Sequence, residues 1–306
     1  MTGSGLNGDL PRVSVIVPVK DDAARLRLCL EALARQTLAA GAFEVIVVDN
    51  GSTRDDPRSV VASFPGVRFE TESETGPAAA RNRGIAVCRG RAIAFTDADC
   101  LPDPKWLEEG LKALASFPNG GMAAGRVLAV PRDPAHPSVL EWFDRFYYFD
   151  QEGCLKRWHF ALTANLFVSR ALLEAIGVFD IRFREAAGED VDFGQRAWRA
   201  GWPQRYAAEA VVRHPALNDA AAFWRRQERA VRTTYGERPA EWRRLLLDVR
   251  HDWPGWTEIR NALGRAEIGC RADRLKLGLL LARIKACRVR IRLNLYGEQF
   301  RRGRGP

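Results

Sequence analysis

Two aspartates, Asp97 and Asp99, end a short apolar run that begins at Ala92 and stops before Pro102. The run has the length and the boundaries of a strand that is buried on both faces. Aspartate is uncommon in strands, and burying a carboxylate without a partner is costly. The two acids are therefore expected to meet a divalent cation, Mg2+ or Mn2+, or a polar ligand.

In an extended chain the two carboxylates point the same way and lie about 7 Å apart. Because bonds from oxygen to Mg2+ are only about 2.1 Å long, one aspartate is expected on the cation and the other on a group beside it. We assign Asp99 to the metal, and Asp97 to a ligand hydroxyl or a metal-bound water. The alternative is a polar turn in which one of them caps a helix started by Pro104.

The elements that must position these acids begin upstream. Residues 13–19 are predicted to form a buried strand, Asp21 or Asp22 to cap a helix that ends near Leu38, and residues 43–48 to form a second strand. Apolar strands that alternate with an amphipathic helix predict a parallel sheet with helices on both faces. Ligands of such sheets bind in the crevice at the carboxyl ends of the strands.

The carboxyl edge of this sheet gathers further residues. Pro18 and Val19 end the first strand, and Asp49 and Gly51 follow the second. Asp49 is expected to accept the ring N–H of a uracil or guanine base. The alternative is an ordinary turn, which every residue from 49 to 52 also favours.

A third strand over 67–71 leads to a helix that Pro77 begins. The free N–H groups at its start can face an anion, and Arg81 or Arg83 would lie near enough to assist a diphosphate. The alternative is a surface helix with two solvated arginines.

Four segments in order resemble the nucleotide-sugar half of family 2 glycosyltransferases, which have the GT-A fold. They read Val15-Ile16-Val17-Pro18, Val47-Val48-Asp49-Asn50-Gly51-Ser52, Ala80-Arg81-Asn82-Arg83-Gly84 and Phe95-Thr96-Asp97-Ala98-Asp99. The acceptor half of the family is resembled by Thr163-Ala164-Asn165-Leu166-Phe167-Val168, Gly177-Val178-Phe179-Asp180 and Gly188-Glu189-Asp190-Val191-Asp192-Phe193. The resemblance covers about residues 12–215, and its specificity comes from the order of the segments.

The resemblance implies roles for individual residues. Asp190 corresponds to the general base that takes the proton from the acceptor hydroxyl, and Glu189 is expected to orient the acceptor. Without the resemblance, both would be interpreted as acids that favour the first turn of a helix. A base opposite the leaving group implies inversion of anomeric configuration. The donor, a nucleoside-diphosphate sugar with UDP favoured by family frequency, is assigned to Pro18, Val19, Asp49, Gly51, Arg81, Asn82, Asp97 and Ala98.

His214 follows a predicted strand, and related GT-A enzymes can place a histidine there as a further metal ligand. The expected metal ligands are therefore Asp99, Asp97 and His214, with a structural hydrogen bond as the alternative for the histidine. Processive polysaccharide synthases of the family carry Gln-x-x-Arg-Trp after the catalytic acid, together with membrane helices. Residues 195–199 read Gln-Arg-Ala-Trp-Arg. Because the spacing differs, we expect the addition of a single sugar.

Charge and cysteine content restrict the class of protein. The chain has 47 Lys and Arg against 38 Asp and Glu; residues 219–306 hold 21 against 10, and residues 1–218 hold 26 against 28. The basic charge thus belongs to the tail. Six cysteines without paired spacing fit a reducing compartment. No uncharged apolar run reaches the ~20 residues that span a bilayer, and the polar start has no apolar signal segment. A cytoplasmic protein is expected.

Two segments have open interpretations. Residues 275–304 mix leucine and isoleucine with lysine and arginine, so they could pack on the catalytic domain or lie on an anionic membrane surface at the inner face of the plasma membrane. The aromatic cluster 142–149 could pack in a core or form a platform for an acceptor. No recognised nucleic-acid-binding module appears, so no nucleic-acid partner is expected.

The sequence therefore predicts an α/β protein with a GT-A fold, a Rossmann-like and mostly parallel central sheet flanked by helices, and a C-terminal helical extension. The expected domains are 1–218, divided into a nucleotide-sugar half (1–103) and an acceptor half (104–218), and a basic extension (219–306). The expected activity is metal-dependent, inverting transfer of one sugar to a carbohydrate or lipid-linked acceptor, in bacterial cell-surface polysaccharide or glycolipid synthesis.

Two other functions stay open at this point. A nucleotidyltransferase has a related sheet, but residues 17–22 lack the glycine-rich loop that usually follows the first strand of those enzymes. A scaffold that binds carbohydrate or membrane without catalysis would not need Asp99 and Asp190.

Overall fold

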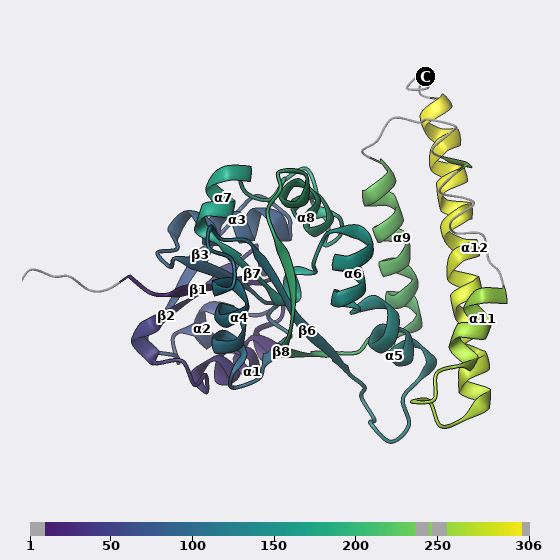
Figure 1. Cartoon of the computed structure of the whole chain (residues 1–306), viewed down its shortest axis with the longest axis horizontal. Helices are drawn as coiled ribbons and strands as arrows, with labels where there is room; N and C mark the ends of the chain where they lie inside the picture. Colours follow the sequence, from purple (N-terminus) through teal and green to yellow (C-terminus); the bar gives the residue numbers. More distant parts are fainter. Residues whose placement is uncertain (1–9, 237–244, 247–255, 302–306) are drawn as a thin grey trace, which may run out of the picture. The chain divides into compact units, whose positions relative to one another are not determined.

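The computed structural model describes residues 10–236, 245–246 and 256–301 (Figure 1). The chain forms two compact units. The first contains the residues up to 128 together with 150–214, and the second contains 129–149 together with the residues from 215 onward. Of the predicted helical tail, residues 237–244, 247–255 and 302–306 lie outside the described residues.

An eight-stranded sheet organises the first unit, with the strand order β3-β2-β1-β4-β7-β6-β8-β5. The first four strands of this order are parallel, whereas β4 with β7, β7 with β6, and β5 with β8 are antiparallel. The strands are β1 Val13–Val19, β2 Phe43–Asp49, β3 Val67–Thr71, β4 Ala92–Phe95, β5 Leu101–Pro102, β6 Met122–Val130, β7 Leu166–Ser169 and β8 Gln204–Pro215. The α/β prediction is confirmed. The parallel half of the sheet consists of strands that the sequence analysis predicted.

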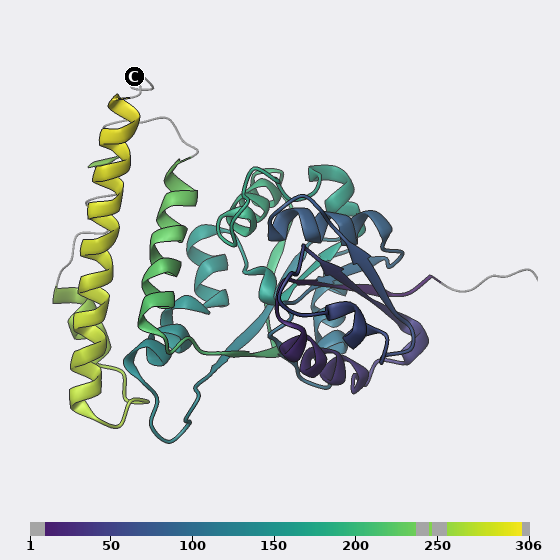
Figure 2. The ribbon, with the colours of Figure 1, turned by 180° about the vertical axis from the view of Figure 1, so that it is seen from behind.

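Helices flank this sheet in Figures 1 and 2. They are α1 Ala23–Ala34, η1 Ala40–Ala42, α2 Pro57–Val61, α3 Pro77–Val87, α4 Trp106–Ala115, α6 Gln151–Trp158, η3 Thr163–Asn165, α7 Arg170–Ile176 and α8 Glu189–Arg199. The core between sheet and helices includes Ile16, Phe95, Val168 and Phe193, all fully buried. Burial of these side chains is the main force that holds α3 and α8 against the sheet.

The start and the end of α1 differ from the prediction. Asp22 occupies the cap position, but its carboxylate makes no capping hydrogen bond. Instead Asp55 Oδ2 accepts the hydrogen bond from the Ala23 N–H at 2.8 Å. The helix ends at Ala34 rather than near Leu38. Beyond its end, the Gln36 side chain donates to Asp103 O (2.9 Å) and accepts a hydrogen bond from Leu107 N (3.0 Å).

The strand that leads to the two aspartates is shorter than predicted. β4 ends at Phe95, and a hydrogen bond from Cys100 N to Asp97 O (3.0 Å) closes a turn over the acidic residues. The expected extended geometry, with both carboxylates on one side, is therefore wrong. The capping alternative is wrong too, since α4 begins at Trp106 with no side-chain cap.

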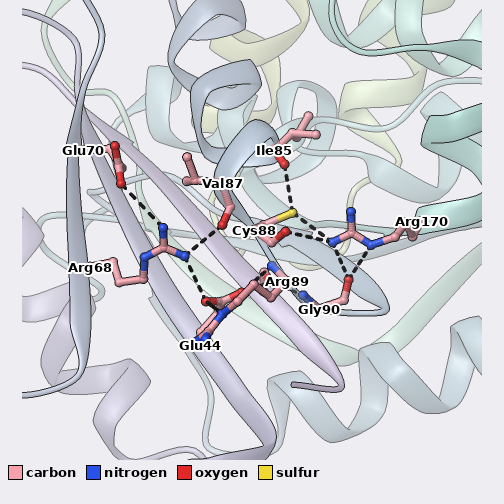
Figure 3. Close-up of polar contacts among 10 residues, drawn as sticks. Glu44, Arg68, Glu70, Ile85, Val87, Cys88, Arg89, Gly90 and Arg170 are labelled. Atoms are coloured by element: carbon pink, nitrogen blue, oxygen red, sulfur yellow. Dashed lines mark hydrogen bonds and ion pairs between the residues drawn. The ribbon is translucent and has the colours of Figure 1, made fainter. Parts of the chain in front are cut away.

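A polar network ties the opposite, amino-terminal edge of the parallel strands together (Figure 3). Glu44 is buried at the start of β2 and accepts hydrogen bonds from Ser14 Oγ (2.7 Å), Arg89 N (2.6 Å) and Arg68 Nη1 (3.3 Å). Burial alone would raise the pKa of Glu44, but the bonds from Ser14 and Arg89 lower it below its usual value. Glu44 is thus a buried carboxylate with hydrogen-bond partners, and it fixes the register of the strands. It lies at the opposite end of the strands from the carboxyl edge.

The second unit is helical around an aromatic core. It contains α5 Val139–Phe143, the π turn η2 Asp144–Tyr148, α9 Ala220–Gly236, α11 Trp256–Leu263 and α12 Arg271–Arg301. Phe143 packs edge-on against Phe223 at 5.2 Å, and Leu277, Leu281 and Ile284 complete the cluster. The burial of Phe143 and Phe149 supports the core interpretation of residues 142–149, while Trp142, Phe146, Tyr147 and Tyr148 stay partly exposed, so the acceptor platform stays a prediction. Among the described helices, none combines the length and the hydropathy needed to cross a bilayer.

A buried ion pair links the two segments of this unit. Asp144 is fully buried in the π turn and pairs with Arg226 of α9, which also lies over the Tyr148 ring at 3.8 Å. The pair explains why a chain segment from between β6 and α6 belongs with the helices that follow β8.

Candidate active site

The loops after β1 and β2 are joined by hydrogen bonds through Ser52. Asp49 Oδ1 accepts bonds from Ser52 N (3.0 Å) and Ser52 Oγ (2.6 Å), and Ser52 Oγ accepts a bond from Asp21 N (2.8 Å). Gly51 has a φ of 78°, a conformation that favours glycine. Among the described residues, Asp49 Oδ2 accepts no hydrogen bond, so this oxygen is the one that a donor base could use.

Pro18 and Val19 form the floor beside this loop. Val19 pairs in register with Asp49, is buried, and accepts a hydrogen bond from Asn50 N at 2.9 Å. Pro18 keeps partial exposure. The structure thus brings Pro18, Val19, Asp49 and Gly51 together at one edge, as the predicted sheet requires.

Asn50 was not singled out in the sequence, although it organises the site. Its side chain donates to Glu72 O (3.2 Å) and Glu74 O (2.7 Å), and accepts a bond from Gly76 N (2.8 Å). Gly76 caps α3 with a φ of 125°, and a Cβ there would lie 2.8 Å from Arg184 O. Asn50 therefore sets where α3 begins. The sequence signal that could have pointed to Asn50 is its position between Asp49 and Gly51, two residues assigned to the donor site.

Arg81 of α3 forms the centre of the site. The side chain is 4% exposed and donates to Asp97 Oδ1 and to Glu189 Oε1, both at 2.9 Å. Burial alone would lower the pKa of the guanidinium, but the Asp97 and Glu189 carboxylates raise it above its usual value. Arg81 thus joins the end of the parallel sheet to the start of α8. The diphosphate role expected of Arg81 stays a prediction.

Glu189 and Asp190 open α8 after Gly188, whose φ is 96°. Burial raises the pKa of Glu189, an effect that Arg81 opposes. Within the described residues, Glu189 Oε2 is buried without a hydrogen-bond partner. Such an orphan acceptor is costly unless a donor, for example a ligand hydroxyl, meets it.

Asp190 lies next to this ion pair and is half-buried. Burial, and after it the charge of Glu189, raises the pKa of Asp190 from 3.8 to about 7. A carboxylate with a pKa near neutrality is matched to proton transfer at neutral pH. Asp190 therefore has the electrostatic character of a general base.

The Asp99 carboxylate contacts different residues from the Asp97 carboxylate. Its carboxylate lies 3.4 Å from His214 Nε2 and 3.7 Å from Arg25 Nη1. Burial raises the pKa of Asp99, and a positive charge on His214 opposes the rise. The structure therefore places Asp99 and His214 side by side, as predicted, and adds Arg25 of α1, which sequence spacing did not suggest.

The donor set around Asp99 fits a divalent cation. Ligand atoms of Asp99, Cys100 and His214 lie within 4.8 Å of one another. A carboxylate and an imidazole suit Mn2+, whereas Mg2+ prefers oxygen ligands throughout. Burial raises the pKa of the Cys100 thiol well above its usual value, so Cys100 is a poor ligand for a hard ion. Asp97, the third predicted ligand, bonds Arg81 instead and is 31% exposed on the same turn.

Two predicted or considered residues have structural partners, and a third is buried. The Asn82 amide both donates to Phe179 O (2.8 Å) and accepts from Phe179 N (3.0 Å), so it fixes the chain before α8. Arg83 pairs with Glu70 at 2.7 Å on an exposed face. Ala98 is buried within the acidic turn.

The comparison with protein families agrees with this arrangement. Residues 14–177, more than half of the chain, match the model of glycosyl transferase family 2. The glycosyltransferase AglE of Haloferax volcanii is 32% identical over 228 residues, which cover 69% of this chain and 69% of that protein. Validoxylamine A glucosyltransferase of Streptomyces hygroscopicus subsp. jinggangensis is 30% identical over 237 residues, covering 67% of this chain and 56% of the relative.

The fold has a solved counterpart. The mannosyltransferase PcManGT from Pyrobaculum calidifontis, in complex with GDP-mannose and Mn2+, superposes with a TM-score of 0.61 over 95% of this chain and 87% of that one, at 24% identity. This likeness establishes the fold, and the family model and the relatives establish the class of enzyme. The chain is a member of glycosyl transferase family 2 with a GT-A fold and a helical C-terminal region.

Proposed function

We propose that this protein transfers a single sugar, with inversion, from a nucleoside-diphosphate sugar to a carbohydrate or lipid-linked acceptor, and that the reaction needs Mn2+ or Mg2+. The observation that carries the proposal is the Arg81 bridge between Asp97 and Glu189. It connects the acids at the end of the sheet with the pair of acids that opens α8. This connection supports a single site for donor and acceptor.

The donor side follows from the loops at the sheet edge. Asp49 Oδ2 would accept the N–H of the base, with Val19 and Gly51 shaping the contact, and Asp99 with His214 would hold the cation. When bound, the cation supplies positive charge to the leaving diphosphate. Asp97, fixed by Arg81, would orient a donor hydroxyl or a water beside the cation. We favour UDP on family grounds, and the GDP-mannose of the Pyrobaculum protein makes guanine the second base to test.

The acceptor side depends on the acids of α8. Glu189 Oε2 would accept a hydrogen bond from the acceptor, and Asp190 would take the proton of the attacking hydroxyl as the new bond forms. The proton moves to the Asp190 carboxylate, the oxygen binds the anomeric carbon, and the nucleoside diphosphate leaves from the opposite face. Because one base serves one displacement, the product has the inverted configuration.

A second part of the proposal concerns the place of the protein in the cell. We propose that the protein works in the cytoplasm in cell-surface polysaccharide or glycolipid synthesis, with its helical unit on the inner face of the plasma membrane. Leu275, Leu279 and Leu293 stay about half exposed on α12 in a segment rich in arginine. Exposed leucines beside cationic side chains favour an anionic lipid surface.

The test uses the release of nucleoside diphosphate from a panel of nucleotide sugars with Mn2+, with Mg2+ and with chelator. Asp190→Asn should lower turnover at least about 100-fold, because a general base contributes on the order of 10²–10⁴. Donor binding, measured by calorimetry, should stay within about twofold of the original protein, since Asp190 acts on the acceptor. Asp192→Asn is the matched control, because Asp192 lies two positions after Asp190 on the same helix and its carboxylate pairs with Arg196, four positions further on. Equal turnover of Asp190→Asn and Asp192→Asn would reject Asp190 as the base.

A further inference from the structure

A groove runs between α9 and α12 in the second unit, a pair of helices that lie side by side in Figures 1 and 2. Its volume is about 600 Å³, and its walls include Trp224, Arg232, Arg283 and Arg290. On α12 the lining positions 283, 286, 287, 290, 291 and 294 follow helical spacing, as do 224, 228 and 232 on α9. The groove is therefore made by one stripe from each helix.

The hollow exists because small side chains separate large ones. Ala286 and Cys287 lie between Arg283 and Arg290 on the α12 stripe, and Ile291 is buried beneath. Small residues between long arginines leave space that the facing helix does not fill.

The two helices run in the same direction along the groove. Arg283 lies over Trp224 at 4.8 Å, Arg288 donates to Gln227 at 3.0 Å, and Val231 shares an apolar cluster with Ile291. The residue numbers of the contacting pairs thus rise in the same direction along both helices. At 1.5 Å per residue, the Trp224 end and the Arg232 end lie about 12 Å apart.

The charge of the groove is positive. Three arginines line it against one acid, Glu228, which accepts a bond from Arg232 Nε at 2.8 Å. That bond leaves both terminal nitrogens of Arg232 available. Arg290 is exposed and has no acidic partner in the part of the chain that the structure describes. Arg232 and Arg290 both line the groove and occupy nearly the same level along the two helices, so both lie at one end of it.

We infer that this groove binds a phosphate-bearing ligand. The phosphate would lie between Arg232 and Arg290, since paired guanidinium groups match phosphate oxygens in geometry and charge. The organic part would extend along Ala286 and Cys287 to the ring of Trp224, whose face Arg283 already covers on one side. This site is separate from the acids that the transferase proposal uses. A lipid phosphate headgroup and a soluble phosphate compound share the chemistry that it recognises.

The test measures binding to the full chain in chelator, without any nucleotide sugar, so that it stands apart from the transfer reaction. Inorganic pyrophosphate is titrated by calorimetry, and vesicles of phosphatidylcholine with and without phosphatidic acid are used in co-sedimentation. The double variant Arg232→Gln with Arg290→Gln should weaken binding at least about tenfold. The double variant Arg271→Gln with Arg301→Gln removes the same charge from exposed positions of α12 outside the groove, and should stay within about twofold.

A charge-neutral variant separates the groove from general attraction to a basic helix. Ala286→Phe fills the hollow, keeps every arginine, and starts from an exposed position that tolerates a larger side chain. It should reduce binding as strongly as the loss of Arg232 and Arg290. Groove-dependent binding of pyrophosphate would identify a soluble ligand, and groove-dependent binding of phosphatidic acid vesicles alone would identify a lipid headgroup. Normal binding by Ala286→Phe, equal losses in both double variants, or no binding of either probe would overturn the inference.

Discussion

Replacing Arg81 by methionine should destabilise the catalytic unit by an amount that depends on pH. The side chain has two ionic partners, of which Glu189 is 4% exposed and Asp97 is 31% exposed. Breaking a buried pair by removing one partner costs about 3–5 kcal/mol, whereas a solvated pair contributes far less. Most of the loss therefore comes from Glu189, which would keep a buried charge without a counterion.

The pH dependence of that loss follows from the pKa of Glu189. Burial already raises it above 4.5, and loss of the Arg81 charge, which lowers it, would raise it further. A group with a raised folded-state pKa contributes stability below its unfolded pKa, and that stability is lost as the pH rises through the folded value. The deficit of Arg81→Met should thus be about 3–5 kcal/mol near pH 8, where Glu189 is ionised or must take up a proton, and clearly smaller near pH 5.

Urea denaturation at both pH values measures this, with the metal removed by chelator. At an m-value of about 1–3 kcal/mol per molar urea, the midpoint near pH 8 should fall by at least about 1 M. Arg83→Met is the control on the same helix, because Arg83 pairs with Glu70 on an exposed face and should cost less than about 1 kcal/mol. A deficit no larger than that of Arg83→Met, or one that does not change with pH, would refute the reasoning.

Two further predictions concern the reaction. Because Asp190 must be ionised to accept a proton and its pKa is about 7, kcat/KM should rise about tenfold from pH 6 to pH 8 and then level off; a flat pH–rate profile would exclude it as the titrating base. Asp99→Ala removes a proposed metal ligand, so calorimetry with donor and Mn2+ should show binding at least about tenfold weaker, with little change in chelator. Unchanged affinity in Mn2+ would remove Asp99 from the metal site.

Local sequence patterns predicted the parallel half of the sheet well, for a physical reason. Residues 13–19 and 67–71 form strands with the predicted bounds. The first is a buried apolar run, and the second alternates apolar Val67 and Phe69 with charged Arg68 and Glu70; both patterns are typical of strands. Pro77 begins its helix as expected, since its fixed φ suits the first turn and it needs no hydrogen bond there.

The partners of the acidic turn could not be predicted in the same way. The chain turns at Asp97, and the turn sends Asp97 to Arg81 and Asp99 to His214, which lie far apart in the sequence. Spacing along an extended strand carries no information about such a turn. Asn50 and Arg25 were missed for a similar reason, since their roles depend on loops and helices that only the folded chain brings close.

The interrupted course of the catalytic unit has a consequence for synthesis on the ribosome. Residues 129–149 emerge between two parts of that unit, but Phe143 packs in a cluster with residues of α9 and α12, and the ionic partner of Asp144 lies on α9. Until those helices leave the exit tunnel, the nascent chain carries an aromatic segment and a carboxylate with no place to bury, a state suited to chaperone binding. A shortened form that ends after β8 would keep that state permanently, so removal of the helical unit requires excision of both of its segments.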